Sequence, residues 1–565
     1  MKEAITPLSP KKRREEAEEI REKATDISQT ESLPKQMTNG EEDEYLQKLK
    51  FPVANFTKGL HHNATTGEVK LADYEKLRDA LQSGKEKDFA QIPLSPEAGR
   101  KWTAPQTGLA FDLEGRDAWS HAIAPVPKLD SRKNDGEMVE LYWMALLRDV
   151  PFITYDSDPG VKAATLELGA LRQEGRDKDK QDIFDSPRLK SITPATVFRG
   201  LTEGDLQGPY LSQFLLHDTP FGSQTIDARQ RTLPPGLDYM TKFADWLKVQ
   251  NGANTTLPDD TLLEPAVVGK RYIRSLRDLA RYVHVDQLHQ AYFNAALLLL
   301  QAANLQFDDG NPYVGDNISA KNQMGFGVFG DPALLVLLTE VATRALKAVW
   351  FQKWFVHRRL RPEEWGGRID VARRKVVSNY PVNQRLLDSQ AHQRILSKYG
   401  SSLLPQAFPE GSPMHPAYGT GHGTVAGACV TVIKAWLKGG EQRIKDLKRR
   451  DGSPLVPLKV PAADGMSLVD YTGPDADALT VDGELNKLAG NIAIARNGAG
   501  VHWRSDYTQA VRLGEEVALG VLREQSILYN EKNHFTVVAF DGRHIRIEDG
   551  KVKVTSTPKD VADAA

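Results

Sequence analysis

Residues 414–423 read Met-His-Pro-Ala-Tyr-Gly-Thr-Gly-His-Gly, and residues 424–433 continue as Thr-Val-Ala-Gly-Ala-Cys-Val-Thr-Val-Ile. The apolar run predicts a buried helix that begins near His422, because the glycines before it let the backbone turn tightly. A helix start offers unpaired N–H groups and the positive end of the helix dipole, which suit an anion. With a histidine at this point, we expect acid–base chemistry on that anion. The alternative is a glycine-rich turn that only precedes a core helix.

Composition indicates a soluble globular protein. Of the 565 residues, 40% are apolar and 26% are charged, and 73 basic against 75 acidic residues leave a net charge of −2. This balance gives no sign of nucleic acid or a membrane as partner. Cys429 lies inside the apolar run, so we expect an inert buried thiol and no intrachain disulfide.

No secretory-type apolar stretch opens the chain, and no run of about 18 apolar residues occurs in it. The sequence therefore favours a cytoplasmic protein without transmembrane helices.

The chain divides into four predicted regions. Residues 1–45 form a charged arm that is mobile, partly helical or packed on a neighbouring subunit. Residues 46–280 form a region of helices and loops, and residues 281–530 a helical bundle with the catalytic residues. Residues 531–565 contain β-prone runs around Asp541-Gly542 and Asp549-Gly550, which predict a β-hairpin element and a flexible tail.

Helical spacing of apolar residues defines the rest of the fold. It predicts helices over 137–149, 271–283, 284–305, 332–359, 424–438, 484–497 and 506–524. The predicted class is mainly α, with helical bundles and a small C-terminal β-hairpin element.

Upstream of the opening stretch lie two cations, Lys353 and Arg361, that can share a helix face. Pro362 should end this helix at Arg361 and free its guanidinium to turn inward. We expect Arg358 and Arg359 to form a solvated basic helix end.

Downstream, Arg496 follows a run of small apolar residues and should lie at the inner end of a packed helix, where it needs an anionic partner. Gly498 and Gly500 allow the chain to double back, so that Arg496 and His502 face one ligand. Taken alone, each residue could be structural.

Together these residues suit a tetrahedral oxyanion. Guanidinium groups grip its oxygens in pairs, and a lysine adds a compact charge. One imidazole could bond the central atom while the other moves protons. The set comprises Lys353, Arg361, Arg496, the backbone and hydroxyl of Gly419-Thr420-Gly421, His422 and His502.

Three segments of this set resemble the signature of the vanadium-dependent haloperoxidases, a superfamily that shares its anion pocket with bacterial acid phosphatases and membrane-bound lipid phosphatases. They are Lys353 with Arg361-Pro362, Gly421-His422, and Arg496 with His502, in that order. The likeness is to the bromoperoxidase branch of marine algae and cyanobacteria, and it covers roughly residues 50–545.

The resemblance implies a vanadate cofactor and a role for each residue. His502 would bond vanadium axially; Lys353, Arg361, Arg496, Thr420 and Gly421 would hold the vanadate oxygens. His422 would be the acid–base residue, with Lys353 and His415 as further catalytic residues, and Trp350 and His415 would shape the halide pocket. The family usually has Ser where this chain has Thr420, so the hydroxyl is kept and a methyl is added.

The implied reaction is oxidation of bromide or iodide, and of chloride as a further option, by hydrogen peroxide. His422 would assist proton transfer to peroxide on vanadate, which acts as a Lewis acid. The hypohalous product would halogenate a small organic acceptor. One alternative is an acid-phosphatase-type phosphohydrolase with His502 as nucleophile, and another is a non-catalytic helical protein that stores an oxyanion.

The resemblance also implies a homo-oligomer, with a dodecamer as one candidate, and structural calcium as a minor possibility. The Asp308-Asp309 loop is the candidate calcium site, although a solvated turn fits it better.

Overall fold

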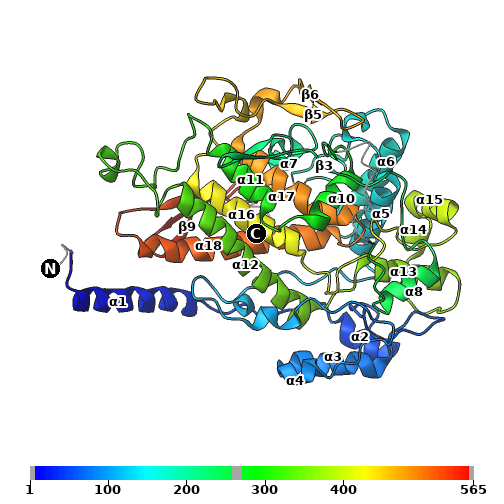
Figure 1. The fold of residues 1–565 in the computed structure, drawn as a ribbon. Helices are drawn as coiled ribbons and strands as arrows, with labels where there is room; N and C mark the ends of the chain where they lie inside the picture. The colour runs from blue at the N-terminus through cyan, green and yellow to red at the C-terminus, as the bar shows by residue number, and fades with distance from the viewer. Residues whose placement is uncertain (1–6, 187, 201, 258–269, 559–565) are drawn as a thin grey trace.

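The computed structural model describes residues 7–186, 188–200, 202–257 and 270–558. A single helix, α16 (Gly421–Trp436), lies at its centre (Figure 1) and packs against α12 (Asp331–Phe351), α17 (Val481–Gly498) and α18 (Arg504–Leu528). Every residue of α16 except His422 is buried. A helix that is covered on all sides must be apolar all round, which is the reason for the run at 424–433. The predicted mainly α fold is confirmed.

Two glycines let α16 and α18 cross at close range. A Cβ added to Gly427 would lie 2.0 Å from the carbonyl oxygen of Val511, and one added to Gly514 would lie 1.9 Å from that of Thr424. Larger residues would therefore push the helices apart. The crossing brings the start of α16 to the start of α18, where the amide of Thr420 donates to the carbonyl oxygen of Asp506 at 3.0 Å.

Further helices surround this centre, and most of them share one hydrophobic core with it. Those nearest the site are α10 (Leu276–Val285), α11 (Gln290–Leu299) and α13 (Pro362–Arg373). The others are α1 (Pro10–Gln29), α2 (Glu41–Lys48), α3 (Leu71–Ser83), α4 (Glu86–Phe89), α5 (Arg132–Leu147), α6 (Pro159–Lys178), α7 (Glu203–Leu206), α8 (Phe243–Gln250), α14 (Gln384–Leu387) and α15 (Gln390–Tyr399). Among the described helices, none has the length and apolar content needed to cross a membrane.

The helix predicted over 271–283 begins later than expected. Lys270 and Arg271 instead form strand β4, which pairs with β3 (Gln230–Arg231). The side chain of Ser275 then accepts a hydrogen bond from the amide of Asp278 and caps α10.

The strands form four small antiparallel sheets among the described residues. The C-terminal sheet contains β7 (Phe535–Val538), β8 (His544–Glu548) and β9 (Lys551–Ser556), so the predicted hairpin is confirmed and gains a third strand. Asp549 and Gly550 have φ of 51° and 72°, the conformation for which an Asp-Gly turn is selected. The remaining strands are β1 (Thr219–Phe221), β2 (Gln224–Ile226), β5 (Lys459–Pro461) and β6 (Leu468–Asp470).

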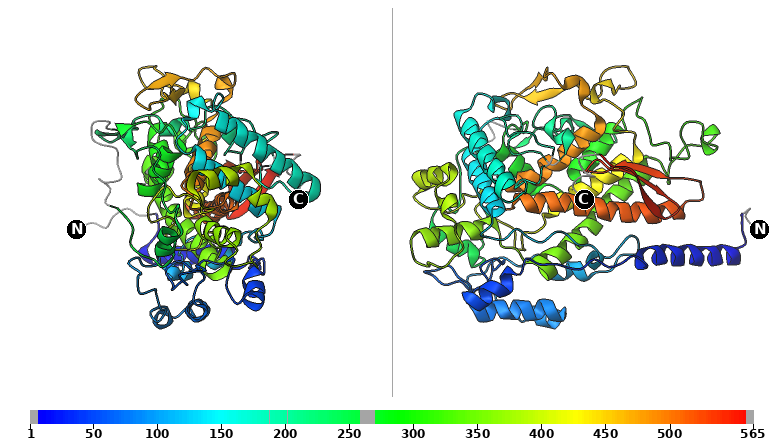
Figure 2. Two further views of the ribbon diagram at one scale, coloured as in Figure 1. Left: turned by 90° about the vertical axis from the view of Figure 1, so that its right-hand side faces the viewer. Right: turned by 180° about the vertical axis from the view of Figure 1, so that it is seen from behind.

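The charged arm contains one long helix, α1, which extends away from the body (Figures 1 and 2). Its C-terminal end is held on α18, where the hydroxyl of Ser28 donates to Glu524. The predicted boundaries at residues 45 and 280 fall within α2 and α10. The end of the predicted flexible tail, residues 559–565, lies outside the described residues.

Candidate active site

The site is built around the N-terminal end of α16. Thr420 precedes the helix and Gly421 is its first residue, as the sequence predicts. The Oγ1 atom of Thr420 is buried and has no hydrogen-bond partner. A Cβ on Gly421 would lie 3.3 Å from the ring of Trp350, so the backbone here is closely covered. An oxyanion bound here would accept hydrogen bonds from the unpartnered hydroxyl and from the free N–H groups at the start of the helix.

Lys353 enters the site from a π-helical turn, Gln352–His357, that follows α12. Its side chain is fully buried, and Nζ donates to the carbonyl oxygens of Pro416 at 3.0 Å and Ala417 at 2.8 Å. Burial, reinforced by the charge of Arg361, lowers the pKa of Lys353 well below its usual value. An anion placed beside a buried lysine stabilises its charged form.

The predicted helix over 332–359 is wrong at its C-terminal end. The π-helical turn stops at Arg358, whose φ is 45°, and α13 starts at Pro362. Proline is favoured at this first helical position, because its N–H would be unpaired there and its φ is already helical. Arg361 therefore precedes a new helix, and it meets Lys353 through a reversal of the chain and not on a shared helix face.

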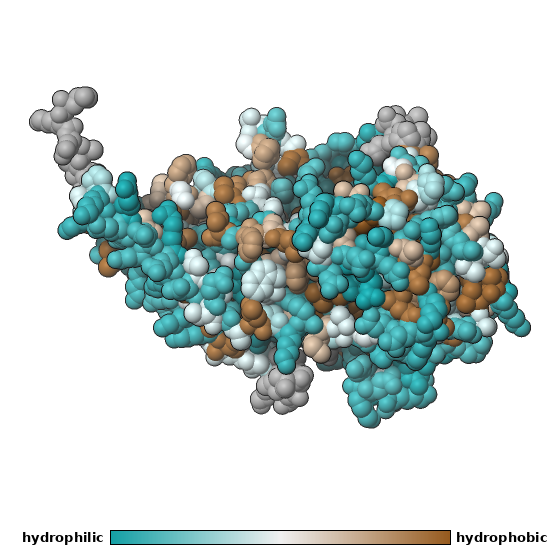
Figure 3. Space-filling view, turned by 90° about the horizontal axis from the view of Figure 1, so that it is seen from below, coloured by the Kyte–Doolittle hydropathy of each residue, from teal (hydrophilic) through white to brown (hydrophobic). Residues whose placement is uncertain are grey.

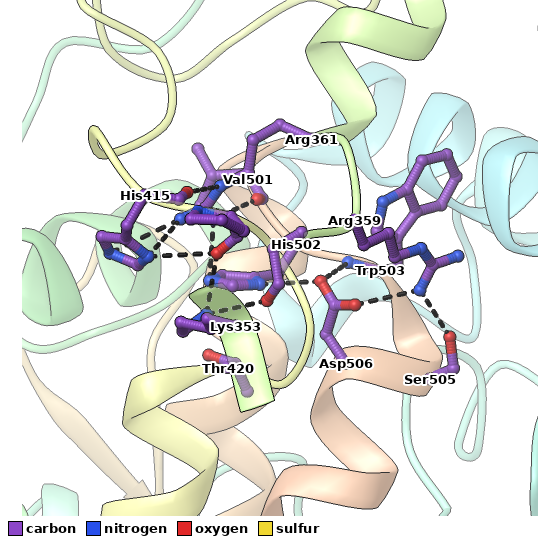
Figure 4. A network of polar contacts seen from close by, with 12 residues as sticks. Lys353, Arg359, Arg361, His415, Thr420, Val501, His502, Trp503, Ser505 and Asp506 are labelled. Atoms are coloured by element: carbon purple, nitrogen blue, oxygen red, sulfur yellow. Dashed lines mark hydrogen bonds and ion pairs between the residues drawn. The ribbon is translucent and has the colours of Figure 1, made fainter. Parts of the chain in front are cut away.

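Arg361 joins two of the predicted imidazoles (Figure 4). Its Nη1 lies 2.9 Å from Nε2 of His502, and its Nη2 lies 2.9 Å from Nδ1 of His415. Its Nε donates to the carbonyl oxygen of His415 at 2.8 Å, and its Nη1 donates to that of Val501 at 2.8 Å. Burial lowers the pKa of Arg361 to about 9. None of these partners is an anion.

Arg496 lies in the last turn of α17 and is buried, as predicted. Its Nη1 donates to the carbonyl oxygen of Val283 at 3.0 Å, whereas its Nε has no partner. Burial lowers the pKa of Arg496 to about 10. The chain then reverses at Gly500, whose φ is 87°, and returns His502 to the site.

His502 is held between a carboxylate and a guanidinium. Its Nδ1 lies 2.8 Å from Oδ2 of Asp506. Since Arg361 only donates, the nearby Nε2 of His502 carries the lone pair and Nδ1 carries the proton. Burial and the charge of Arg361 lower the pKa of His502 well below its usual value. The ring is therefore a neutral ligand with a free electron pair at Nε2.

His415 stacks at an angle on Trp350, with ring centroids 4.7 Å apart. Burial and Arg361 lower the pKa of His415 well below its usual value. The indole N–H of Trp350 donates to the carbonyl oxygen of Thr103 at 2.9 Å, which fixes the orientation of the ring. The two predicted halide-pocket residues therefore form one wall next to Lys353, whose Nζ lies 5.8 Å from the centroid of the Trp350 ring.

His422 is the one residue of α16 with partial access to solvent. Its Nε2 lies 3.0 Å from Oδ1 of Asp286, whose side chain is only 3% exposed. A carboxylate in this position orients the ring.

Comparison with known proteins identifies the family that has this arrangement of residues. A family model described as the VCPO second helical-bundle domain matches residues 334–530. The vanadium-dependent bromoperoxidase of Corallina officinalis is 37% identical over an alignment 565 positions long, which spans 88% of this chain and 91% of that protein. That of Ascophyllum nodosum is 32% identical over an alignment 533 positions long, which spans 91% of this chain and 89% of that protein.

The chain belongs to the vanadium-dependent bromoperoxidase family. The structure of the homohexameric second vanadate-dependent bromoperoxidase (AnII) of Ascophyllum nodosum is similar throughout, with a TM-score of 0.85 and 25% identity. The match covers 98% of this chain and 93% of that one.

The donors of the site fit the oxyanion of this bromoperoxidase family. Lys353, Arg361 and Arg496 supply three buried cations, whereas Asp506 is the carboxylate that offsets part of their charge from behind His502. The Nε of Arg496 and the Oγ1 of Thr420 are buried without partners. A buried donor without a partner is costly, and an anion in the site would accept hydrogen bonds from both groups.

Two arginines expected at the surface are buried instead. Arg359 is 1% exposed and contacts Asp506 at 2.9 Å and Glu137 at 3.1 Å. Arg358 is largely covered and pairs with Glu42. The prediction of a solvated helix end is wrong, because the chain turns at Arg358 into the interior and not into solvent.

Two carboxylates that contact the candidate site residues were not predicted from the sequence. Asp506 could have been found, because it begins the helix predicted over 506–524, and a carboxylate in the first turn of a helix reaches back to the residues just before the helix. Asp286 is separated from His422 by 136 residues. Its local sequence carries no signal, because it falls inside the helix predicted over 284–305, whereas in the structure it directly follows α10.

The Asp308-Asp309 loop is not a simple solvated turn. Asp308 is buried and accepts a hydrogen bond from the amide of Gly310 at 2.9 Å, and burial raises its pKa to about 6. Within the described ranges, no group of three or more His, Cys, Asp or Glu side chains is placed to hold a metal ion. Structural calcium therefore stays a prediction from the family. Cys429 is buried and free, as expected.

Proposed function

We propose that this chain is a vanadate-dependent haloperoxidase that oxidises bromide or iodide with hydrogen peroxide to a hypohalous species, which halogenates a small organic acceptor. The observation that supports this best is the cluster of Lys353, Arg361 and Arg496 around the unprotonated Nε2 of His502. These cations come from three separate elements, and each is buried. Oxidation of chloride is a further option that only kinetics can decide.

Vanadate, when bound, would supply a Lewis acid that polarises peroxide. Lys353, Arg361 and Arg496 would hold its oxygens, together with the hydroxyl of Thr420 and the amide of Gly421. Because these donors are fixed before the cofactor arrives, little reorganisation is needed as charge develops in the reaction.

His502 would hold the vanadate through the lone pair on Nε2. Asp506 would keep the proton on Nδ1 and orient the ring, as outer partners of metal-bound histidines do. The amide of Trp503 also donates to Oδ2 of Asp506 at 3.0 Å, so the carboxylate is itself fixed.

His422 would be the acid–base residue. Its bond to Asp286 leaves Nδ1 as the ring nitrogen available for a proton of peroxide. The Asp286 carboxylate would orient the ring, and the partial exposure of His422 would allow exchange of its proton with solvent. His415 and Trp350 would bound the halide, with Lys353 as the neighbouring charge.

The phosphohydrolase alternative is not favoured. Its pocket would need the same cations, but relatives over about nine-tenths of this chain are vanadium-dependent bromoperoxidases. A storage protein would not need the His422–Asp286 pair beside its anion.

The decisive experiment is peroxide-dependent bromination of a phenol dye by metal-free protein, with and without added vanadate. We expect activity only with vanadate, bromide and peroxide together. Cleavage of a phosphate ester without any bromination would overturn the proposal.

We further propose that the chain forms a homo-oligomer, as does the homohexameric AnII. Four apolar residues of α1 recur at helical spacing on one face, namely Ala17, Ile20, Ala24 and Ile27. The underside of the molecule shows apolar patches beside α1 (Figure 3). A second copy would cover this face of α1, and the number of copies, six or twelve, is left to measurement.

A further inference from the structure

A cavity of about 210 Å³ adjoins Asp286, the partner of His422. It lies between α10, α11 and the hairpin of β1 and β2, and the reactions proposed above do not use it. Its apolar lining includes Phe214, Ile226, Tyr282, Val285 and Ala291.

Two buried polar atoms on this lining have no partner, and both are acceptors. One is Oδ2 of Asp286, since Oδ1 is taken by His422. The other is Nε2 of His217. The ring of His217 is hydrogen-bonded to the backbone of Pro457, and burial lowers its pKa to about 4. The ring is therefore neutral at pH 7, with its proton on Nδ1 and a lone pair on Nε2.

The charge of the cavity differs from that of the candidate vanadate site formed by Lys353, Arg361 and Arg496. No lysine or arginine occurs among the described residues that line it, whereas Asp227 and Asp286 do. Asp227 is already paired with Arg229 and Lys270. Asp286 contacts His422 through Oδ1, and its Oδ2 is left as a free acceptor. An acceptor without a cation beside it on the lining disfavours an anion and favours a molecule that donates hydrogen bonds.

We infer that this cavity binds the organic acceptor as a neutral aromatic ring with an O–H or N–H group, of the phenol or indole class. The polar group would donate to Asp286 or His217, and the ring would lie against Phe214 and Tyr282. The volume suits a molecule of one or two rings, since drug-sized ligands need about 300 Å³ or more. This inference rests on the proposed function.

A ring held here would lie one carboxylate away from the acid–base histidine. Bromine would pass from hypobromous acid to a ring carbon; the O–Br bond breaks, and the displaced ring proton and the hydroxide form water. Asp286 would hold the donor group of the ring without taking part in that exchange.

Binding can be measured on vanadate-free protein, independently of turnover, by equilibrium dialysis with phenol, toluene and benzoate as probes. We expect phenol to bind more tightly than toluene, which lacks a donor, and more tightly than benzoate, which carries a negative charge. His217→Phe should weaken phenol binding about ten-fold, the effect of one lost hydrogen bond to a buried group.

Val285→Trp places a large side chain at the exposed edge of the cavity and leaves the buried residues unchanged. Val285 is 49% exposed, and Val554 on β9 has the same exposure, so Val554→Trp is the matched control. We expect weaker phenol binding in Val285→Trp and none of this loss in Val554→Trp. Equal phenol binding by all these proteins, or binding of benzoate as tight as that of phenol, would overturn the inference.

Vanadate-loaded wild-type protein should also be assayed for bromide-dependent consumption of peroxide without any organic acceptor. If peroxide is consumed but phenol does not bind, the proposed function stands and the cavity inference is wrong. If phenol binds in the cavity but peroxide is not consumed, the cavity binds phenol as inferred and the proposed function is wrong.

Discussion

Nδ1 of His502 lies 2.8 Å from Oδ2 of Asp506, while the other oxygen of that carboxylate lies 2.9 Å from Arg359. The carboxylate of Asp506 therefore links His502, the candidate vanadium ligand, to Arg359, a buried arginine that is not one of the three proposed vanadate-binding cations. Burial raises the pKa of Asp506, and the charge of Arg359 opposes this.

Asp506→Asn should weaken vanadate binding about 10- to 100-fold, because the ring of His502 loses the partner that fixes its tautomer. It should also lower the free energy of unfolding by about 2 kcal/mol, since Arg359 keeps Glu137 but loses one of its two carboxylates. Vanadate titration followed by vanadium NMR and chemical denaturation measure the two effects. Ser505→Ala is the control, because it removes a contact of Arg359 and leaves the His502–Asp506 bond intact. Unchanged vanadate affinity in Asp506→Asn would refute a positioning role for the carboxylate.

His422→Ala should lower kcat for bromide oxidation about 10²- to 10⁴-fold, the usual contribution of a general acid or base. Vanadate affinity should change little, because the anion is held chiefly by the three cations. Asp286→Asn should reduce kcat less, since the imidazole itself remains. Steady-state kinetics at saturating vanadate would decide this, and a His422→Ala protein with wild-type kcat would contradict the acid–base assignment.

Thr420 allows the hydroxyl and the methyl of one side chain to be separated. Thr420→Val removes the hydroxyl and keeps the shape, so vanadate affinity should fall about ten-fold through loss of a buried hydrogen bond. Thr420→Ser keeps the hydroxyl and removes a buried methyl, which should cost about 1 kcal/mol of stability and leave affinity almost unchanged. That methyl packs closely on Gly423, where an added Cβ would lie 2.6 Å from it. If Val binds vanadate as tightly as Thr and Ser do, the hydroxyl is not a cofactor contact.

Glu515 gives the stability a definite dependence on pH. Burial raises its pKa from 4.5 to about 7. Between these values the unfolded chain releases a proton that the folded chain keeps, so stability falls as pH rises, by at most about 1.4 kcal/mol per pH unit. Below pH 4.5 and above pH 7 this contribution is constant. Melting temperatures of wild type and Glu515→Gln should therefore diverge between pH 4.5 and 7, with the variant gaining relative stability.

Glu516, the next residue, is the control with the opposite sign. Burial acts to raise its pKa, but the hydrogen bond and charge of His121 bring it below the usual value. Its contribution is therefore present above pH 4.5 and lost as pH falls, so Glu516→Gln should lose stability at neutral pH. The same slope in both variants would show that the pH dependence arises elsewhere.

Ile20→Asp should shift the oligomer to smaller species, because it places a charge in the apolar face of α1. Thr25→Asp introduces the same charge away from that face and should leave the assembly intact. Sedimentation velocity measures both. Identical assemblies in the two variants would exclude this face of α1 as the contact.

Much of the site followed from local sequence. The apolar run after Gly423 set the position of α16, and the glycines after Arg496 predicted the reversal that returns His502. These features depend on propensities and backbone freedom over a few residues, which a single stretch of sequence carries. The end of the helix between Lys353 and Arg361 was missed, because one proline can either end a helix or start one.

The sequence by itself determined the central helix, the set of cations and the family. Tertiary structure alone decided which charges are matched. Arg359 and Arg361 are two residues apart, yet Arg359 meets Glu137 and Asp506 while Arg361 meets only neutral groups. The physical reason is that burial and charge pairing depend on elements hundreds of residues apart, which meet only when the helices pack.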